Sequence, residues 1–515
     1  MRGRLVLAFS LLAGVFAAAG FAGRAAAPTT ITFGVTEDAT KYADDGGAKY
    51  FQAIHDLGMV EDRVIVYWDE NTPRQILEQD FLDRMMPVAA KSGVNVVFAI
   101  QPLHARAFAV NTDSRIAAFA DYVRLVALRY PQVRDYVIGN EPNTKRFWQP
   151  QHSPDGKIVS AGTYEQVLAA AYDALKGVDP TVRVEGPGTT PGGNDGAYGV
   201  GDESVSPVRF IAALGAAYRA SGRKAPLVDL VDVHSYSAIN NIPLTQPRKW
   251  PQAGPADLDR LKQAWWDAFH GTGQPLFQET GDPATGTYVK FRIDESGTQV
   301  QIDPTKVNPS LYTGKENVPV VSEATQAKWY TGLINLIKCD PDVATLDLFH
   351  LIDEPALLGF QSGLLRVDGS KRPSYAAVQK AIAAAGTCPT PHTWKHTTTV
   401  IGVRGSFDLR DKTKKATGFP ATVLTGEEVS AVGGVFPLTS GVVPSNAALR
   451  QAFAGGPFTP VLRIKGLVKA NSSRTFKFKG RLQPGRYVYA FLVSATMNPA
   501  RTKLLVSGPF TVLRY

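Results

Sequence analysis

The chain has 515 residues, of which 44% are hydrophobic and 20% are charged. This composition is that of an ordinary globular protein, so it excludes wholesale disorder and allows a large buried core. The formal net charge of +9 is unevenly distributed, because residues 391–515 hold 18 Lys and Arg but only four Asp and Glu. The balance is therefore +14 for this C-terminal quarter and −5 for residues 1–390, and two domains are the simplest expectation for the length.

The N-terminus has the pattern of a secretory signal peptide. Arg2 and Arg4 precede an apolar run over residues 5–21, and small residues follow up to Ala27. We therefore predict a signal peptide over residues 1–27 and a secreted or cell-envelope protein. An uncleaved anchor is the alternative, although the run is short for a membrane span. No later apolar segment reaches the length of a span, so we do not expect the chain to cross a membrane.

Eight short β-rich apolar runs follow, separated by amphipathic stretches. They cover residues 31–38, 63–69, 95–101, 135–140, 183–186, 230–236, 275–280 and 345–351. Eight such units predict a (β/α)₈ barrel, an α/β fold, over residues 28–390; an open doubly wound sheet is the alternative. Residues 282–322 contain two further β-like stretches around Asp294-Glu295-Ser296-Gly297, which we interpret as a hairpin lid over the barrel mouth.

The pattern changes after a proline-rich segment at residues 388–391. Alternating runs near residues 476–479, 487–491 and 504–506 predict a small all-β immunoglobulin-like sandwich domain over residues 391–515. The two cysteines, Cys339 and Cys388, are too few for a disulfide scaffold and lack the spacing of a zinc site. One disulfide bond between them is expected if the chain is exported.

Two of the predicted strands end in a glutamate. The fourth ends in Asn140-Glu141-Pro142-Asn143, and the seventh ends in Glu279-Thr280. With these motifs the chain resembles the clan A glycoside hydrolases, which are retaining enzymes on (β/α)₈ barrels. The resemblance implies that Glu141 is the acid/base and Glu279 the nucleophile, with the carboxyl groups about 5–5.5 Å apart.

The same resemblance implies roles for neighbouring residues. Asn140 is placed to bind the sugar 2-hydroxyl. The sixth strand ends in His234-Ser235-Tyr236, where the Tyr236 hydroxyl orients the nucleophile and His234 is a weaker site candidate, because a lone histidine at a strand end is more often structural.

The chain departs from the family at two positions that shape the sugar pocket. Many members carry an Arg on strand two and a Trp at the end of strand eight; here these strands close with Trp68-Asp69 and Phe349-His350. We expect Trp68, Phe349 or the loop residue Trp148 to stack on the sugar, with core packing as the alternative. His350 is a further candidate for substrate binding.

A catalytic metal is weighed because His104, His234 and His350 all fall near strand ends. Metal-dependent barrel hydrolases place a His-x-His on strand one, where this chain has Val35-Thr36-Glu37-Asp38. We therefore predict no metal and no cofactor.

These observations together predict a secreted retaining glycoside hydrolase that cleaves O-glycosidic bonds. A transglycosidase on the same scaffold and a non-catalytic glycan-binding envelope protein are the alternatives. The expected partners are a carbohydrate substrate and, through the basic C-terminal domain, an anionic cell-surface polymer; no nucleic-acid partner is expected.

Overall fold

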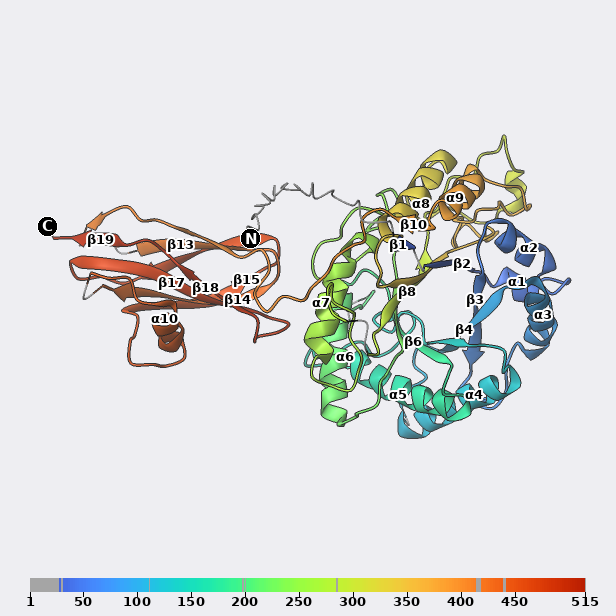
Figure 1. The fold of residues 1–515 in the computed structure, drawn as a ribbon, viewed down its shortest axis with the longest axis horizontal. Helices are drawn as coiled ribbons and strands as arrows, with labels where there is room; N and C mark the ends of the chain where they lie inside the picture. The colour runs from blue at the N-terminus through green and yellow to red at the C-terminus, as the bar shows by residue number, and fades with distance from the viewer. Residues whose placement is uncertain are drawn as a thin grey trace, which may run out of the picture.

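The computed structural model describes residues 27–28, 31–110, 112–196, 199, 201–283, 286–413, 418–438 and 441–514. Almost the whole predicted signal peptide lies outside the described residues. The backbone of β1 (Ala27–Pro28) pairs antiparallel with β10 (Thr387–Cys388). The chain forms a barrel and, beside it, a pair of C-terminal sheets (Figure 1).

Eight parallel strands close into a barrel, which excludes the open doubly wound sheet. In chain order they are β2 (Thr32–Thr36), β3 (Glu61–Trp68), β4 (Asn95–Pro102), β5 (Asp135–Ile138), β6 (Arg183–Thr189), β7 (Leu230–His234), β8 (Lys290–Ser296) and β9 (Val343–Leu348). The predicted barrel fold is thus confirmed. Each predicted strand overlaps one of these except the seventh.

The prediction of strand seven at residues 275–280 is wrong. The seventh barrel strand is β8, in the segment that we expected to form a hairpin lid. Residues 275–280 form no strand: Phe277 is buried against Phe291 of β8 with ring centroids 4.3 Å apart, and the Thr280 N–H donates to the Trp394 carbonyl while the Trp394 N–H donates to Thr280 Oγ1. The segment is apolar because Phe277 packs on β8 from the outside of the barrel.

Helices surround the barrel (Figure 1). They are α1 (Ala39–Tyr42), α2 (Ala48–Asp56), α3 (Gln79–Ser92), α4 (Thr112–Arg129), α5 (Ser160–Val178), α6 (Pro207–Ser221), α7 (Leu258–Phe269), α8 (Glu323–Ile337) and α9 (Pro373–Ala383), with 3₁₀ turns η1 (Pro255–Asp257) and η2 (Pro309–Leu311). The long loop after β8, residues 297–322, is held by Asn240, whose side chain donates to the Gln299 and Pro319 carbonyls. In the described part of the chain, every helix is too short or too polar to cross a membrane.

The C-terminal part is built from two packed sheets, mainly antiparallel. One has the order β11 (Arg404–Phe407), β13 (Gly418–Thr425), β16 (Ser472–Lys479). The other has the order β12 (Lys412–Thr413), β19 (Phe510–Leu513), β17 (Gly485–Ala495), β14 (Val429–Pro437), β15 (Leu462–Val468), with β18 (Thr502–Val506) paired to β17 and α10 (Asn446–Phe453) on its outer face. A separate hydrophobic core lies between the sheets.

Polar contacts join the sheets to the barrel along α6 and α7. Arg501 is 4% exposed and lies 2.6 Å from Glu427 within the sheets and 3.1 Å from Asp267 on α7. Arg209 on α6 approaches Glu428 at 3.4 Å. The predicted Cys339–Cys388 disulfide is confirmed and ties the end of α8 to the segment after α9.

Candidate active site

Glu141 stands just past the end of β5, the fourth strand of the barrel. Its backbone has a φ of +40°, in the left-handed region that non-glycine residues rarely adopt. Hydrogen bonds hold this conformation: the Glu141 N–H donates to the Gly188 carbonyl at 3.0 Å, and its own carbonyl accepts from Thr144. Asn143 is fully buried and donates to the Thr190 and Val205 carbonyls, so the second Asn of the motif anchors the loop.

Glu295, on β8, faces Glu141 across the barrel mouth. One carboxylate oxygen of each residue and a ring nitrogen of His234 all lie within 4.8 Å of one another. The Tyr236 hydroxyl donates to Glu295 Oε2 at 2.9 Å, and Arg63 Nη1 donates to Glu295 Oε1 at 3.1 Å. The fourth and seventh strands thus bring two carboxyl groups together, one of them held by directed donors.

His234 joins the two carboxylates. Its Nδ1 lies 3.0 Å from Glu141 Oε1 and 3.2 Å from Glu295 Oε2, and its Nε2 lies 3.3 Å from Asp294 Oδ1. Burial alone would lower the pKa of His234, but the charges of Glu295 and Asp294 and the contact with Glu141 outweigh it and raise the pKa to about 9. The imidazole is therefore a cation at neutral pH.

Opposing effects act on Glu295. Burial raises the pKa of its carboxyl group above the ordinary value, and the His234 and Arg63 cations offset only part of that rise. Burial, and next the charge of Glu295, raise the pKa of Tyr236 well above its ordinary value, so this hydroxyl keeps its proton. Two hydrogen-bond donors, Tyr236 and Arg63, and the His234 cation therefore face Glu295, and each favours its ionised form.

Glu279, which we predicted to be the nucleophile, lies outside the group of side chains that contains Glu141. Glu279 lies in the segment before β8, away from Glu141, where it contacts Nδ1 of His396 in the linker. The His396 ring stacks on Trp266 of α7 with centroids 4.0 Å apart. Glu279 thus belongs to the junction between the barrel and the C-terminal sheets.

An arginine on strand two is present after all. Arg63 lies near the start of β3, completely buried, with its side chain inside the barrel. Its Nη2 donates to Asn140 Oδ1 at 3.1 Å, and its Nε lies 2.7 Å from Asp294. The residues that end the strand do not reveal this arginine, because its long side chain reaches the mouth from the start of β3. Asn140 itself is 8% exposed, beside the two carboxylates.

The two tryptophans expected to stack on the sugar are core residues. Trp68 is fully buried and stacks on Phe108 at 5.4 Å, and Trp148 is 2% exposed and stacks on the same ring at 5.1 Å. Neither indole can present a face to a ligand. The aromatic groups near Glu295 are instead Tyr236, Phe349 and Phe360, with Phe349 and Phe360 packed edge to face at 4.9 Å.

His350 lies between the ends of β2 and β9. Its Nδ1 is 2.8 Å from the Thr36 carbonyl, and its Nε2 is 3.3 Å from Glu354. Burial lowers its pKa, but Glu354 and Glu37 outweigh that effect and raise it to about 9. His350 therefore supplies a buried positive charge at the mouth, paired with Glu354.

Among the described residues, four groups of side chains have the composition of a metal site; in the fourth, formed by Asp259, Asp340 and His392, the Lys262 ammonium lies 2.8 Å from Asp340. The first two are the charged cluster around His234, with Glu141 and Glu295 or with Asp232 and Asp294. The Arg63 guanidinium contacts both Asp294 and Glu295, and its positive charge would repel a metal cation there.

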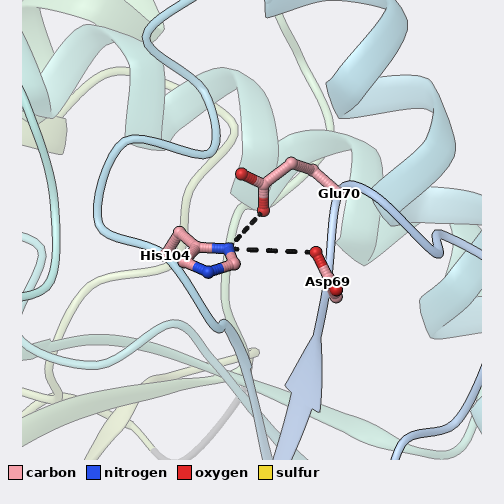
Figure 2. Close-up of side chains that lie close together, drawn as sticks. All are labelled: Asp69, Glu70 and His104. Carbon is pink, nitrogen blue, oxygen red and sulfur yellow. Dashed lines mark hydrogen bonds and ion pairs between the residues drawn. The ribbon is translucent and has the colours of Figure 1, made fainter.

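The third group is at the barrel rim, where Asp69 and Glu70 follow β3 and His104 follows β4 (Figure 2). His104 Nδ1 lies 3.1 Å from Glu70 and 3.8 Å from Asp69, and the imidazole is half exposed. Asp69 Oδ1 already accepts two hydrogen bonds from Asn71 at 2.9 Å. These contacts explain why the three side chains lie together at the rim.

Glu295, Arg63 and Asp294 are the site residues that sequence reasoning missed. A signal for β8 existed: in Lys290-Phe291-Arg292-Ile293-Asp294, apolar and charged residues alternate as in a strand. The apolar residues face the helices and the charged ones face the barrel interior.

No protein-family profile and no curated protein sequence matches the chain. Solved structures similar to it include a family 39 glycoside hydrolase from Bacteroides cellulosilyticus (14% identity, 88% of this chain and 81% of that one, TM-score 0.46). A monomeric beta-xylosidase from Caulobacter crescentus (14% identity, 91% and 97%, TM-score 0.45) is another. A third is GH5_18 from Streptomyces cattleya (17% identity, 75% and 85%, TM-score 0.46).

Proposed function

We propose that the protein is a retaining glycoside hydrolase in which Glu295 is the nucleophile and Glu141 the acid/base. The observation that carries the proposal is the pair of carboxylates from opposite strands with oxygens within 4.8 Å of each other. Retaining enzymes hold their carboxyl groups about 5–5.5 Å apart, whereas inverting enzymes need about 6.5–9.5 Å to admit a water molecule.

In the first step, a Glu295 oxygen attacks the anomeric carbon while the bond to the leaving oxygen breaks and Glu141 gives that oxygen its proton. In the second step, Glu141 takes a proton from water, the water oxygen attacks the anomeric carbon, and the ester to Glu295 breaks. Tyr236 and Arg63 hold the Glu295 carboxylate for attack. Asn140, fixed by Arg63, is placed to bind the sugar 2-hydroxyl.

The test is a panel of aryl β-glycosides assayed with Glu295→Ala, Glu141→Ala and Glu279→Ala. We expect Glu295→Ala to lose nearly all activity, and azide to restore cleavage with a glycosyl azide of inverted configuration. Glu141→Ala should lose most on substrates with poor leaving groups, which need protonation. Glu279→Ala is the matched control, since it removes an identical group outside the site.

Near-full activity of Glu295→Ala, on a substrate that the wild type cleaves, would refute the assignment. A transglycosidase would share both carboxylates and would transfer the sugar to added acceptors in preference to water. Binding without cleavage across the panel would favour a non-catalytic glycan-binding protein.

We also propose that the protein is exported and that its basic C-terminal part meets an anionic cell-surface polymer. Export is supported by the signal-like sequence over residues 1–27 and by the Cys339–Cys388 disulfide, since disulfides persist mainly in oxidising compartments. The charge of residues 391–515 supports the partner. Edman sequencing of the secreted protein would test the cleavage.

A further inference from the structure

The basic charge of the C-terminal part is concentrated in its second half. All four acidic residues of segment 391–515 precede Val429, and the 12 Lys and Arg after that point have no carboxylate side chain among them. The last two acidic residues, Glu427 and Glu428, already contact Arg501 and Arg209. The strands after β14 therefore carry positive charge that the domain does not neutralise.

Five of these cations lie on the two strands that close one edge of the sandwich. β15 is the last strand of the larger sheet and β16 the last strand of the smaller one, and residues 469–471 connect them. Their exposed cations are Arg463 and Lys465 on β15 and Arg474, Lys477 and Lys479 on β16, which we call the basic edge.

The strand pattern fixes the direction of these side chains. On β16, Phe476 and Phe478 are buried in the core, so Lys477 and Lys479 alternate outward. Successive outward positions on one strand are about 7 Å apart. Leu462 and Ile464 pack on the same core, which turns Arg463 and Lys465 toward the outer face of the larger sheet, where Arg463 Nη2 donates to the Ala452 carbonyl of α10 at 3.0 Å.

Arg474 connects the two strands, because its Nη1 donates to the Leu467 carbonyl at 2.8 Å. Among the described residues, no carboxylate forms a salt bridge with any member of the basic edge.

The basic edge starts beside the barrel. Asn471, in the short connection between β15 and β16, lines a cavity of about 580 Å³ together with Val208 of α6 and Gln263 of α7. A linear polymer lying on the edge would therefore run toward the flank of the barrel. The pair of exposed cations Lys477 and Lys479 suits a linear polyanion, which engages both at once and releases its counterions.

We infer that the basic edge binds an anionic glycan, a linear polysaccharide with carboxylate or phosphate groups. The identification of the polyanion as a glycan rests on the proposed function of the barrel, whereas the expectation that the edge binds a polyanion rests on its exposed cations alone. The two buried rings of β16 leave no aromatic platform on that strand for stacking nucleic-acid bases. An alternative role for edge-strand lysines is to prevent edge-to-edge aggregation.

The test measures binding of the full chain to polygalacturonate as the carboxylate polymer and to inorganic polyphosphate as the phosphate polymer. Dextran is the neutral control. The variant is Lys477→Gln/Lys479→Gln, and the matched control is Lys91→Gln/Lys328→Gln, which removes two exposed lysines from barrel helices. A Lys477→Arg/Lys479→Arg variant keeps the charge. Cleavage of a small aryl glycoside is measured in parallel.

We expect the Gln pair on the edge to bind one or both polyanions roughly tenfold more weakly, with a shallower dependence of affinity on salt. The Arg pair and the barrel pair should stay within about twofold of the wild type. Aryl glycoside cleavage should not change in any of them. Cleavage without polyanion binding would overturn the basic edge alone, and binding without cleavage would overturn the proposed catalysis alone.

Three other results would overturn the inference. The first is no binding to either polyanion even at low salt. The second is aggregation of the edge variant with unchanged affinity, which would assign the lysines to edge protection. The third is equal or tighter binding to single-stranded oligonucleotide or to vesicles of phosphatidylglycerol and phosphatidylcholine, which would replace the glycan by another class of partner.

Discussion

The hydroxyl of Tyr236 offers the most direct test of how the site ionises its nucleophile. Tyr236→Phe removes one oxygen atom from a buried ring and leaves the packing against Phe349 in place. The lost bond is the 2.9 Å donation to Glu295 Oε2. A hydrogen bond to a charged group contributes about 1.5–3 kcal/mol, which corresponds to a rise of roughly one to two units in the pKa of Glu295.

The sign of the effect follows from the reaction. Glu295 attacks only when ionised, so a higher pKa shifts the acidic limb of the kcat/KM profile to higher pH. The assay is that profile for wild type and Tyr236→Phe, on an aryl glycoside whose leaving group needs no protonation. The loss should be greatest at low pH and should shrink on the alkaline side. An acidic limb that stays in place while kcat/KM falls equally at every pH would refute the reasoning.

Three further predictions concern groups around the site and the fold. The pKa of His234 is about 9 in the folded protein against an ordinary 6.5, so its protonation contributes roughly 3 kcal/mol to the free energy of unfolding below pH 6.5, and this contribution is lost as the pH rises through 9. The free energies of unfolding of wild type and His234→Asn, measured in urea, should therefore converge over that pH range. Trp148→Ala should lower the free energy of unfolding by about 3–5 kcal/mol and leave KM unchanged, because the indole packs in the core. A raised KM in the folded variant would indicate that Trp148 contacts the sugar. Cys339→Ser/Cys388→Ser removes a disulfide between residues 49 apart in sequence and should lower the free energy of unfolding by about 4 kcal/mol. An unchanged midpoint of denaturant unfolding would contradict this.

The barrel could be predicted because most of its strands are apolar on both faces. Strands such as β4 read as continuous hydrophobic runs, and their order and spacing are enough for eight βα units. Glu141 could be placed at the barrel mouth from the same pattern, since only Gly139 and Asn140 separate it from β5, a strand of four buried residues. Trp68 and Trp148 could not be placed, because a strand-end or loop aromatic can face either the mouth or the helices.

The seventh strand escaped prediction because the barrel interior at that point is ionic. Arg292 of β8 is fully buried and lies 2.8 Å from Glu61 and 2.9 Å from Asp347, with Glu185 also in contact. Each charge is tolerated only because strands on several sides of the barrel supply its partners. Such partners are distant in sequence, so β8 by itself resembles an exposed polar hairpin.

The same ionic interior explains why segment 275–280 resembles a barrel strand more closely than β8 does. Continuous hydrophobicity locates strands whose inward side chains are apolar, and β8 has inward charges. In this chain Asp294 and Glu295 are adjacent, and Arg63 contacts both, so the charges that obscure β8 as a strand are also those that orient its carboxylate. Segment 275–280 has the hydrophobicity of a strand because Phe277 covers β8 from outside. In a barrel with catalytic carboxylates, an alternating charged run that follows an apolar run is therefore the better candidate for the strand.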